Sequence, residues 1–157
     1  MQWGTSTLPC FFFMLLAAVF PLWPQEAARN QTRTGDPLSF LGMGLAELIG
    51  SLGPPEAVYA LRGNEDWQDD VVFVYNEGDF YIFRDRVWQV AVKSVYGLAL
   101  GDPKAAALMV LPAVGEGLQD RGDYALLVLP GGSWQRMLRV NFSGGRVSAI
   151  FIYRSDF

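Results

Sequence analysis

The chain has 157 residues, 51% of them hydrophobic and 14% aromatic, which is enough to bury the core of one domain or of two very small ones. Its net charge is −4 at pH 7 without a block of Lys and Arg, which excludes the basic surface typical of nucleic-acid-binding proteins. The absence of histidine from the sequence excludes Ser-His-Asp and Cys-His catalysis and histidine-based metal sites.

Residues 1–28 have the character of an export signal. They contain an apolar run at 11–22, which is shorter than the roughly 20 residues of a membrane-spanning helix. No Lys or Arg precedes that run, so a retained N-terminal anchor stays open as the alternative to a cleaved signal. We therefore expect an exported protein, periplasmic or secreted, that is either released or tethered near a membrane through residues 11–22. The polar stretch 29–38 predicts a linker.

The first predicted helix lies within residues 41–55. Apolar side chains recur there at helical spacing, at Leu45, Leu48, Ile49 and Leu52. Gly53 is suited to close the helix, and the two prolines that follow it prevent its continuation. A helix of about ten residues is marginal alone in water, so its apolar face needs a sheet to lie on.

The chain after this helix predicts strands. Residues 57–70 are interpreted as a loop, in which 58–61 are suited to a short strand. Three antiparallel strands joined by tight turns follow, at 71–75, 80–83 and 86–94. The same order is predicted for the rest of the chain: a helix within 100–115, a polar loop at 116–122, and strands at 123–129, 135–142 and 146–154.

This order predicts an α+β fold made of two tandem units, residues 39–96 and 97–157. Each unit is expected to be a helix plus a three-stranded antiparallel meander, and the units together to form one sheet with the helices on one face. Strand alternation predicts that four side chains face the helices: Val90, Val92, Ile150 and Ile152. Trp88 has the parity of Val90 and is predicted to lie in the core.

The helix signature also carries a family resemblance. Its residues are Leu41-Gly42-Met43, Ala46-Glu47-Leu48 and Leu52-Gly53-Pro54-Pro55. They resemble the corresponding residues of the BamE/SmpA family of small exported proteins, and the doubled form resembles the β-lactamase inhibitor protein family. The resemblance implies a non-catalytic binding module, acting in envelope assembly or as an inhibitor of another protein. It supplies no residue of known function to carry over.

Candidate site residues are outward-facing strand residues and large aromatic side chains in loops. The candidates for partner binding are Trp67, Gln89, Lys93, Trp134, Phe151 and Tyr153. A cluster of carboxylates offers weak candidates for Ca²⁺ at Glu65, Asp66, Asp69 and Asp70, although a solvated loop is the preferred interpretation. No Gly-rich loop has cofactor-binding spacing, so no cofactor is expected.

The expected function is therefore that of an exported non-catalytic module that binds another protein, envelope-associated or secreted, through its open sheet face and its loops. A small-ligand or lipid carrier is the alternative.

Overall fold

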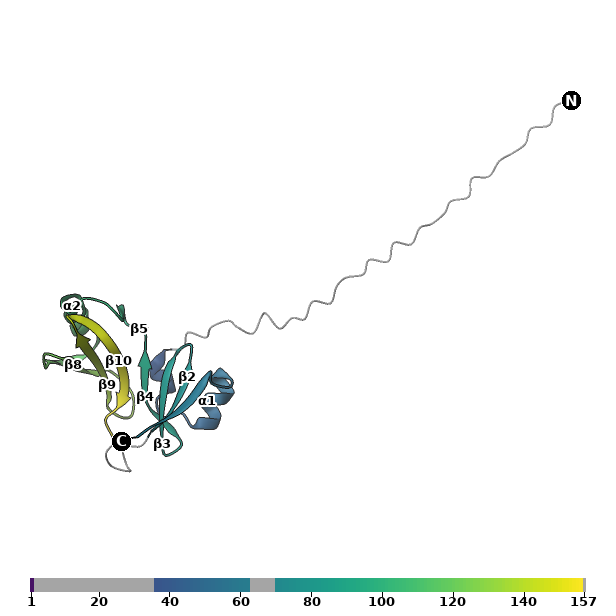
Figure 1. The fold of residues 1–157 in the computed structure, drawn as a ribbon, viewed down its shortest axis with the longest axis horizontal. Coiled ribbons are helices and arrows are strands. Elements are labelled where there is room, and N and C mark those ends of the chain that lie inside the picture. The colour runs from purple at the N-terminus through teal and green to yellow at the C-terminus, as the bar shows by residue number, and fades with distance from the viewer. Residues whose placement is uncertain (2–35, 63–69, 157) are drawn as a thin grey trace. The chain divides into compact units, whose positions relative to one another are not determined.

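The computed structural model describes residues 1, 36–62 and 70–156. The main sheet in that part of the chain is made of β1 (Ala57–Leu61), β2 (Asp70–Tyr75), β3 (Gly78–Phe83), β4 (Arg86–Val92), β7 (Glu116–Asp120), β8 (Tyr124–Leu129), β9 (Arg136–Ser143) and β10 (Arg146–Arg154). All neighbouring strands are antiparallel, in the spatial order β1-β2-β3-β4-β10-β9-β8-β7. The sheet therefore has a first half, β1–β4, and a second half, β7–β10, that meet where β4 pairs with β10 (Figure 1).

Two α-helices and two smaller elements complete the described fold. They are η2 (Pro37–Phe40), α1 (Leu45–Leu52), α2 (Lys104–Val114) and a small hairpin of β5 (Ser94–Val95) and β6 (Leu98–Ala99). The prediction of α1 is confirmed: Gly53 follows it with a φ of +84° and donates its N–H to the Ile49 carbonyl at 2.8 Å. In the described residues, neither helix is long and apolar enough to cross a membrane.

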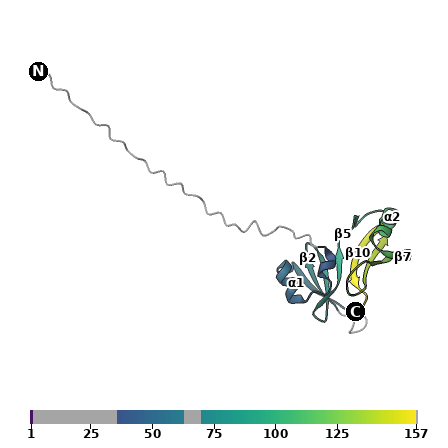
Figure 2. The same ribbon diagram turned by 180° about the vertical axis from the view of Figure 1, so that it is seen from behind.

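A single cluster of buried side chains joins both helices to the sheet. Leu48 of α1 and Leu111 of α2 are fully buried in it, together with residues from both halves of the sheet. Seen from the front and from behind, α1 lies beside the first half and α2 beside the second half (Figures 1 and 2). The four strand residues predicted to face the helices, Val90, Val92, Ile150 and Ile152, are all buried in this cluster.

The expected three-stranded units are wrong, because each half of the sheet has four strands. The additional strands are the outer ones: β1 contains the short strand suggested at 58–61, and β7 occupies the stretch interpreted as a polar loop. An outer strand has a neighbour on one side only, and here all of β1 and most of β7 stay exposed. Their side chains therefore lack the buried-to-exposed alternation by which a strand is predicted from sequence.

The prediction for Trp88 is also wrong. The register of β3 with β4 runs from Tyr81↔Gln89 to Ile82↔Val87, so Trp88 is the extra residue of a β-bulge. The bulge removes Trp88 from the parity of Val90, and its ring contacts side chains on the sheet face away from the helices.

Candidate binding surface

The sheet face opposite α1 and α2, here called the open face, carries a connected group of aromatic side chains. We call this group the aromatic cluster; its members are Tyr81 of β3, Trp88 of β4, and Phe151 and Tyr153 of β10. All four are half-buried. Because β4 and β10 are neighbours, the aromatic cluster lies where the two halves of the sheet meet.

The rings of the aromatic cluster pack edge to face. The centroid of the Tyr81 ring lies 6.5 Å from that of Trp88 and 6.4 Å from that of Phe151. The centroids of Trp88 and Tyr153 are also 6.4 Å apart, and the three interplanar angles lie between 73° and 76°. Such edge-to-face pairs stabilise ring positions beyond simple burial. The surface is therefore pre-ordered, which lowers the entropy that a partner must remove on binding.

Hydrogen bonding holds the indole of Trp88 in place. Its Nε1–H donates to the Oδ1 of Asp70 at 2.8 Å, which ties β4 to the start of β2 across β3. Val72 of β2 pairs with Tyr81 of β3 and so lies on the same side of the sheet, where its side chain is fully buried. Asp70, one of the weak metal candidates, thus has a structural partner; Glu65, Asp66 and Asp69 lie outside the described residues.

The phenol groups of the aromatic cluster stay protonated well into the alkaline range. Burial raises the pKa of Tyr81 above its ordinary value of 10.0, and nearby Tyr59, Asp79 and Asp70 raise it further. Burial also raises the pKa of Tyr153. Near neutral pH both hydroxyls are therefore uncharged and able to donate and accept hydrogen bonds.

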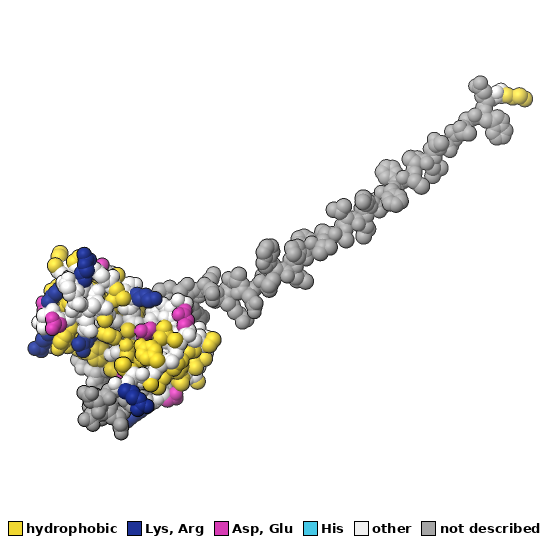
Figure 3. Space-filling view, in the orientation of Figure 1, with side chains coloured by type: hydrophobic (Ala, Val, Ile, Leu, Met, Phe, Trp, Pro, Cys, Tyr) yellow, Lys and Arg dark blue, Asp and Glu magenta, His cyan; other side chains and the backbone are white. Residues whose placement is uncertain are grey.

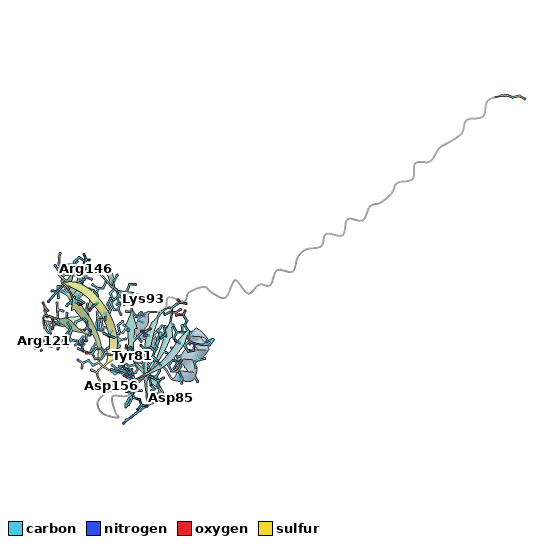
Figure 4. The ribbon with its side chains drawn as sticks, viewed as in Figure 1. Tyr81, Asp85, Lys93, Arg121, Arg146 and Asp156 are labelled. Atoms are coloured by element: carbon cyan, nitrogen blue, oxygen red, sulfur yellow. The ribbon has the colours of Figure 1, made fainter. Side chains whose placement is uncertain are left out.

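A cation of β9 lies beside the aromatic cluster on the open face. Arg139 pairs with Phe151 across β9 and β10, and its guanidinium lies 4.4 Å from the centre of the Tyr124 ring. The Arg139 Nε–H donates to the Asn141 Oδ1 at 2.8 Å. Figure 3 shows hydrophobic side chains gathered over the first half of the sheet. Tyr81 can be located in the same orientation by its label in Figure 4. The surface thus combines an apolar centre with one ordered cation.

The predicted binding residues separate into distinct places. Gln89, Phe151 and Tyr153 lie on the open face, where Gln89 pairs with both Tyr81 and Tyr153. Lys93 is exposed directly after β4. Trp67 lies outside the described residues. Sequence reasoning missed Tyr81, although its half-buried position between two buried neighbours in β3 follows from strand alternation.

Trp134 is not part of the open-face group. It lies at the turn between β8 and β9, where the Arg154 guanidinium is 4.2 Å from the centre of its ring. A hollow of about 530 Å³ lies at this turn, lined by Glu116, Val128, Leu129, Pro130, Gly131, Gly132, Ser133, Trp134 and Gln135. The buried Trp134 Nε1 and Arg136 Nε have no hydrogen-bond partner among the described residues.

In the described part of the chain, no three His, Cys, Asp or Glu side chains gather closely enough to hold a metal ion. For the carrier alternative, the relevant feature is the hollow at the β8–β9 turn, which lies within the second half of the sheet.

No family model matches the chain, and no curated protein does. Among solved structures, an extracellular protein containing a SCP domain from Bacillus anthracis str. Ames matches with a TM-score of 0.50 and 12% identity, over 81% of this chain and 48% of that chain. A cysteine-rich secretory protein from Staphylococcus aureus subsp. aureus Mu50 matches with a TM-score of 0.48 and 14% identity, over 78% and 47%. The chain thus spans about half the length of either protein.

At this identity the Bacillus protein shows a shared fold alone. Its match, together with the four strands in each half, overturns the resemblance to the BamE/SmpA and β-lactamase inhibitor protein families. The tandem repeat inferred from the order of the predicted elements is likewise wrong. A short helix signature of Gly, Leu and Pro residues specifies how a helix begins and ends, and many folds need the same beginning and end.

Proposed function

We propose that the chain is an exported, non-catalytic module that binds another protein through the open face of its sheet. The observation that carries this proposal is the aromatic cluster, four half-buried rings held edge to face at the centre of the face that the helices leave uncovered. Large, rigid, partly exposed aromatic side chains are the residues that most often dominate the energy of protein interfaces.

The mixed chemistry around the cluster supports a protein as the partner. Arg139 lies beside Phe151, Gln89 lies between Tyr81 and Tyr153, and the two phenols keep their hydroxyl hydrogens near neutral pH. An apolar centre with hydrogen-bonding groups at its border is the usual anatomy of a protein interface.

Two observations support the exported location. Residues 1–28 have the apolar run of an export signal, and the Bacillus neighbour with the shared fold is described as an extracellular protein. Fractionation of cells that produce the chain tests this part by itself. Recovery outside the cytoplasm agrees with it, and recovery only in the cytoplasm contradicts it.

Site-specific photo-crosslinking tests the binding surface. A photoreactive amino acid at Phe151 should capture a partner in the producing cells, whereas the same group at Met109 should not. Met109 lies on α2 and is 82% exposed, so it is a matched accessible control away from the open face.

The captured partner then allows a measurement of affinity. We expect Phe151→Ala with Tyr153→Ala to weaken binding by about 30-fold or more, the size of an interface hot spot, while Met109→Ala leaves it unchanged. Equal affinity of the open-face variant and the wild type, with the fold retained by circular dichroism, would remove the open face as the binding surface. Capture of a small molecule or lipid without any protein would favour the carrier alternative.

A further inference from the structure

The two outer edges of the sheet differ in chemistry. At one edge, β7 begins with Glu116 and ends with Asp120, and its register with β8 shifts between Glu116 and Gln119. Gly117, within that shift, has a φ of +65°, and Lys104 of α2 forms an ion pair with Asp120 at 3.0 Å. Charges and bulges are the means by which proteins keep an edge strand from pairing with another chain.

β1, at the opposite edge, has none of these protections within its described residues. Its sequence is Ala-Val-Tyr-Ala-Leu, without charge, proline or glycine, and it pairs with β2 in continuous register over all five residues. Every side chain of the strand is exposed: Val58 at 52%, Tyr59 at 45% and Leu61 at 47%. The outward backbone N–H and C=O groups of a regular apolar edge are a template for a further strand.

The residues on either side of β1 make this edge complementary to itself. Two copies of β1 can pair antiparallel about a two-fold axis at Tyr59, so that apolar side chains lie opposite apolar side chains. In that register Glu56 of each copy falls opposite Arg62 of the other, and opposite charges meet at both ends of the pairing. Both of these side chains are exposed, and Arg62 also has an interaction within its own chain.

This register is the one that brings the two charges together. An axis moved by one residue, to Val58 or Ala60, no longer places Glu56 opposite Arg62. Opposite charges in directly facing cross-strand positions stabilise a strand pair, and like charges destabilise it. Charge complementarity therefore favours a second copy of this chain over an unrelated strand as the partner of β1.

We propose that the chain forms a symmetric dimer in which β1 pairs antiparallel with β1 of a second copy, centred on Tyr59. The two eight-stranded sheets then continue into one another. Because the two-fold axis of such a strand pair is perpendicular to the sheet, both open faces point to the same side. The dimer is independent of the proposed function, although it would present two aromatic clusters on one surface.

Exchange of the two charges tests the register. In sedimentation of the purified full chain, the wild type should approach twice the monomer mass of 17.4 kDa as its concentration rises. We expect Glu56→Arg and Arg62→Glu to weaken dimerisation about tenfold each, because each places like charges opposite one another twice. The double variant Glu56→Arg/Arg62→Glu should restore the wild-type constant, a recovery that a local folding defect would not produce.

A disulfide tests the axis. Directly opposite residues of antiparallel strands have Cα atoms about 4.5–5.5 Å apart, within the range of about 4.4–6.8 Å that a disulfide accepts. In a Cys10→Ser background, Tyr59→Cys should therefore give a covalent dimer on mild oxidation. Met109→Cys, on an exposed position of α2, is the control and should stay monomeric.

Three results would overturn the proposal. The first is a monomeric mass at every concentration. The second is a dimer whose affinity is unchanged by the charge variants. The third is a dimer in which Tyr59→Cys forms no more disulfide than Met109→Cys, since that dimer would use another surface. Protection from hydrogen exchange of those β1 amides that point away from β2, in a monomer, would assign the edge to another segment of the same chain.

Discussion

Each half of the sheet is anchored to its helix by the same backbone pattern. In the first half, the Gly42 N–H donates to the Val87 carbonyl at 2.7 Å, and Arg86 Nη1 donates to the Gly42 carbonyl at 2.9 Å. In the second half, Gly101 donates to the Val147 carbonyl at 2.8 Å, and Arg146 Nη1 donates to the Gly101 carbonyl at 2.7 Å. The segment before each helix is thus hydrogen-bonded to the last strand of its own half.

The halves differ in the side chain that each carries at the β-bulge of its central strand. Both central strands carry a bulge, at Trp88 in β4 and at Ser148 in β10. Trp88 is half-buried and hydrogen-bonded to Asp70, whereas Ser148 is exposed. Backbone anchoring and core burial thus set the architecture of both halves, while the side chains that point outward from each half are free to differ.

The largest expected effect tests whether the halves share one core. Leu48→Ala in α1 and Leu111→Ala in α2 each empty a fully buried position, and each should lower the free energy of unfolding by about 2–5 kcal/mol. Since both leucines belong to one buried cluster, urea unfolding followed by circular dichroism should stay a single transition in either variant. Two separated transitions would show instead that the halves unfold independently.

The two bulges give the next contrast. Trp88→Phe keeps an aromatic ring but removes the hydrogen bond to the Asp70 carboxylate, which should cost about 1.5–3 kcal/mol of unfolding free energy. Ser148→Ala changes an exposed side chain and should stay within about 0.5 kcal/mol of the wild type. Denaturant midpoints of the two variants measure this directly, and equal losses would show that the hydrogen bond between Trp88 and Asp70 adds no stability.

The same contrast explains what the sequence could predict. Helix α1 and the inner strands each bury one face in the core. Their apolar residues therefore recur at the period of a helix or a strand, which can be recognised in the sequence. The bulge at Trp88 has no such signal, because one extra residue in β4 is decided by pairing with β3. Strand alternation predicted that Phe151 and Tyr153 point away from the helices, as they do. It gave the wrong side for Trp88, whose ring contacts that of Tyr153.

The prediction missed the outer strand β7 for a second reason. A strand such as β7, with Glu116, Gly117 and Asp120, has loop-like composition, and its strand conformation follows from pairing with β8. The hairpin of β5 and β6 is two residues per strand, too short for any periodicity. Site residues could therefore be predicted where the alternation within one strand decides which way a side chain points. They could not be predicted where the pairing register between two strands decides it.

The glycines that anchor the two helices have the same backbone conformation but different surroundings. Gly42 and Gly101 have nearly equal φ values of +83° and +88°, so Ala at either position is strained by about 1–2 kcal/mol. A Cβ at Gly101 meets open space, whereas at Gly42 it lies 3.0 Å from Arg154 Nη1 and 3.3 Å from the Trp134 ring. Gly42→Ala should therefore lose more stability than Gly101→Ala. Equal denaturant midpoints would show that the Trp134–Arg154 pair moves away without cost.

The smallest effect concerns the hairpin that connects the halves. Tyr96, at its turn, has its pKa raised to about 12, first by burial and then by Asp36 before η2, while Arg136 of β9 acts in the opposite direction. The unfolded chain loses this proton near pH 10, so between pH 10 and about 12 the folded state binds more protons than the unfolded state. The free energy of unfolding should therefore fall as pH rises through that window.

Tyr96→Phe removes this titration and should flatten part of that alkaline decline, leaving the contributions of Tyr75, Tyr81 and Tyr153, whose pKa values are also raised. Urea midpoints measured below pH 10 and near pH 12 provide the test, with Tyr153→Phe as the matched variant on the open face. A steeper decline in Tyr96→Phe than in the wild type would contradict the sign of the shift. It would mean that burial, with the smaller contribution of Asp36, does not raise the pKa of this phenol.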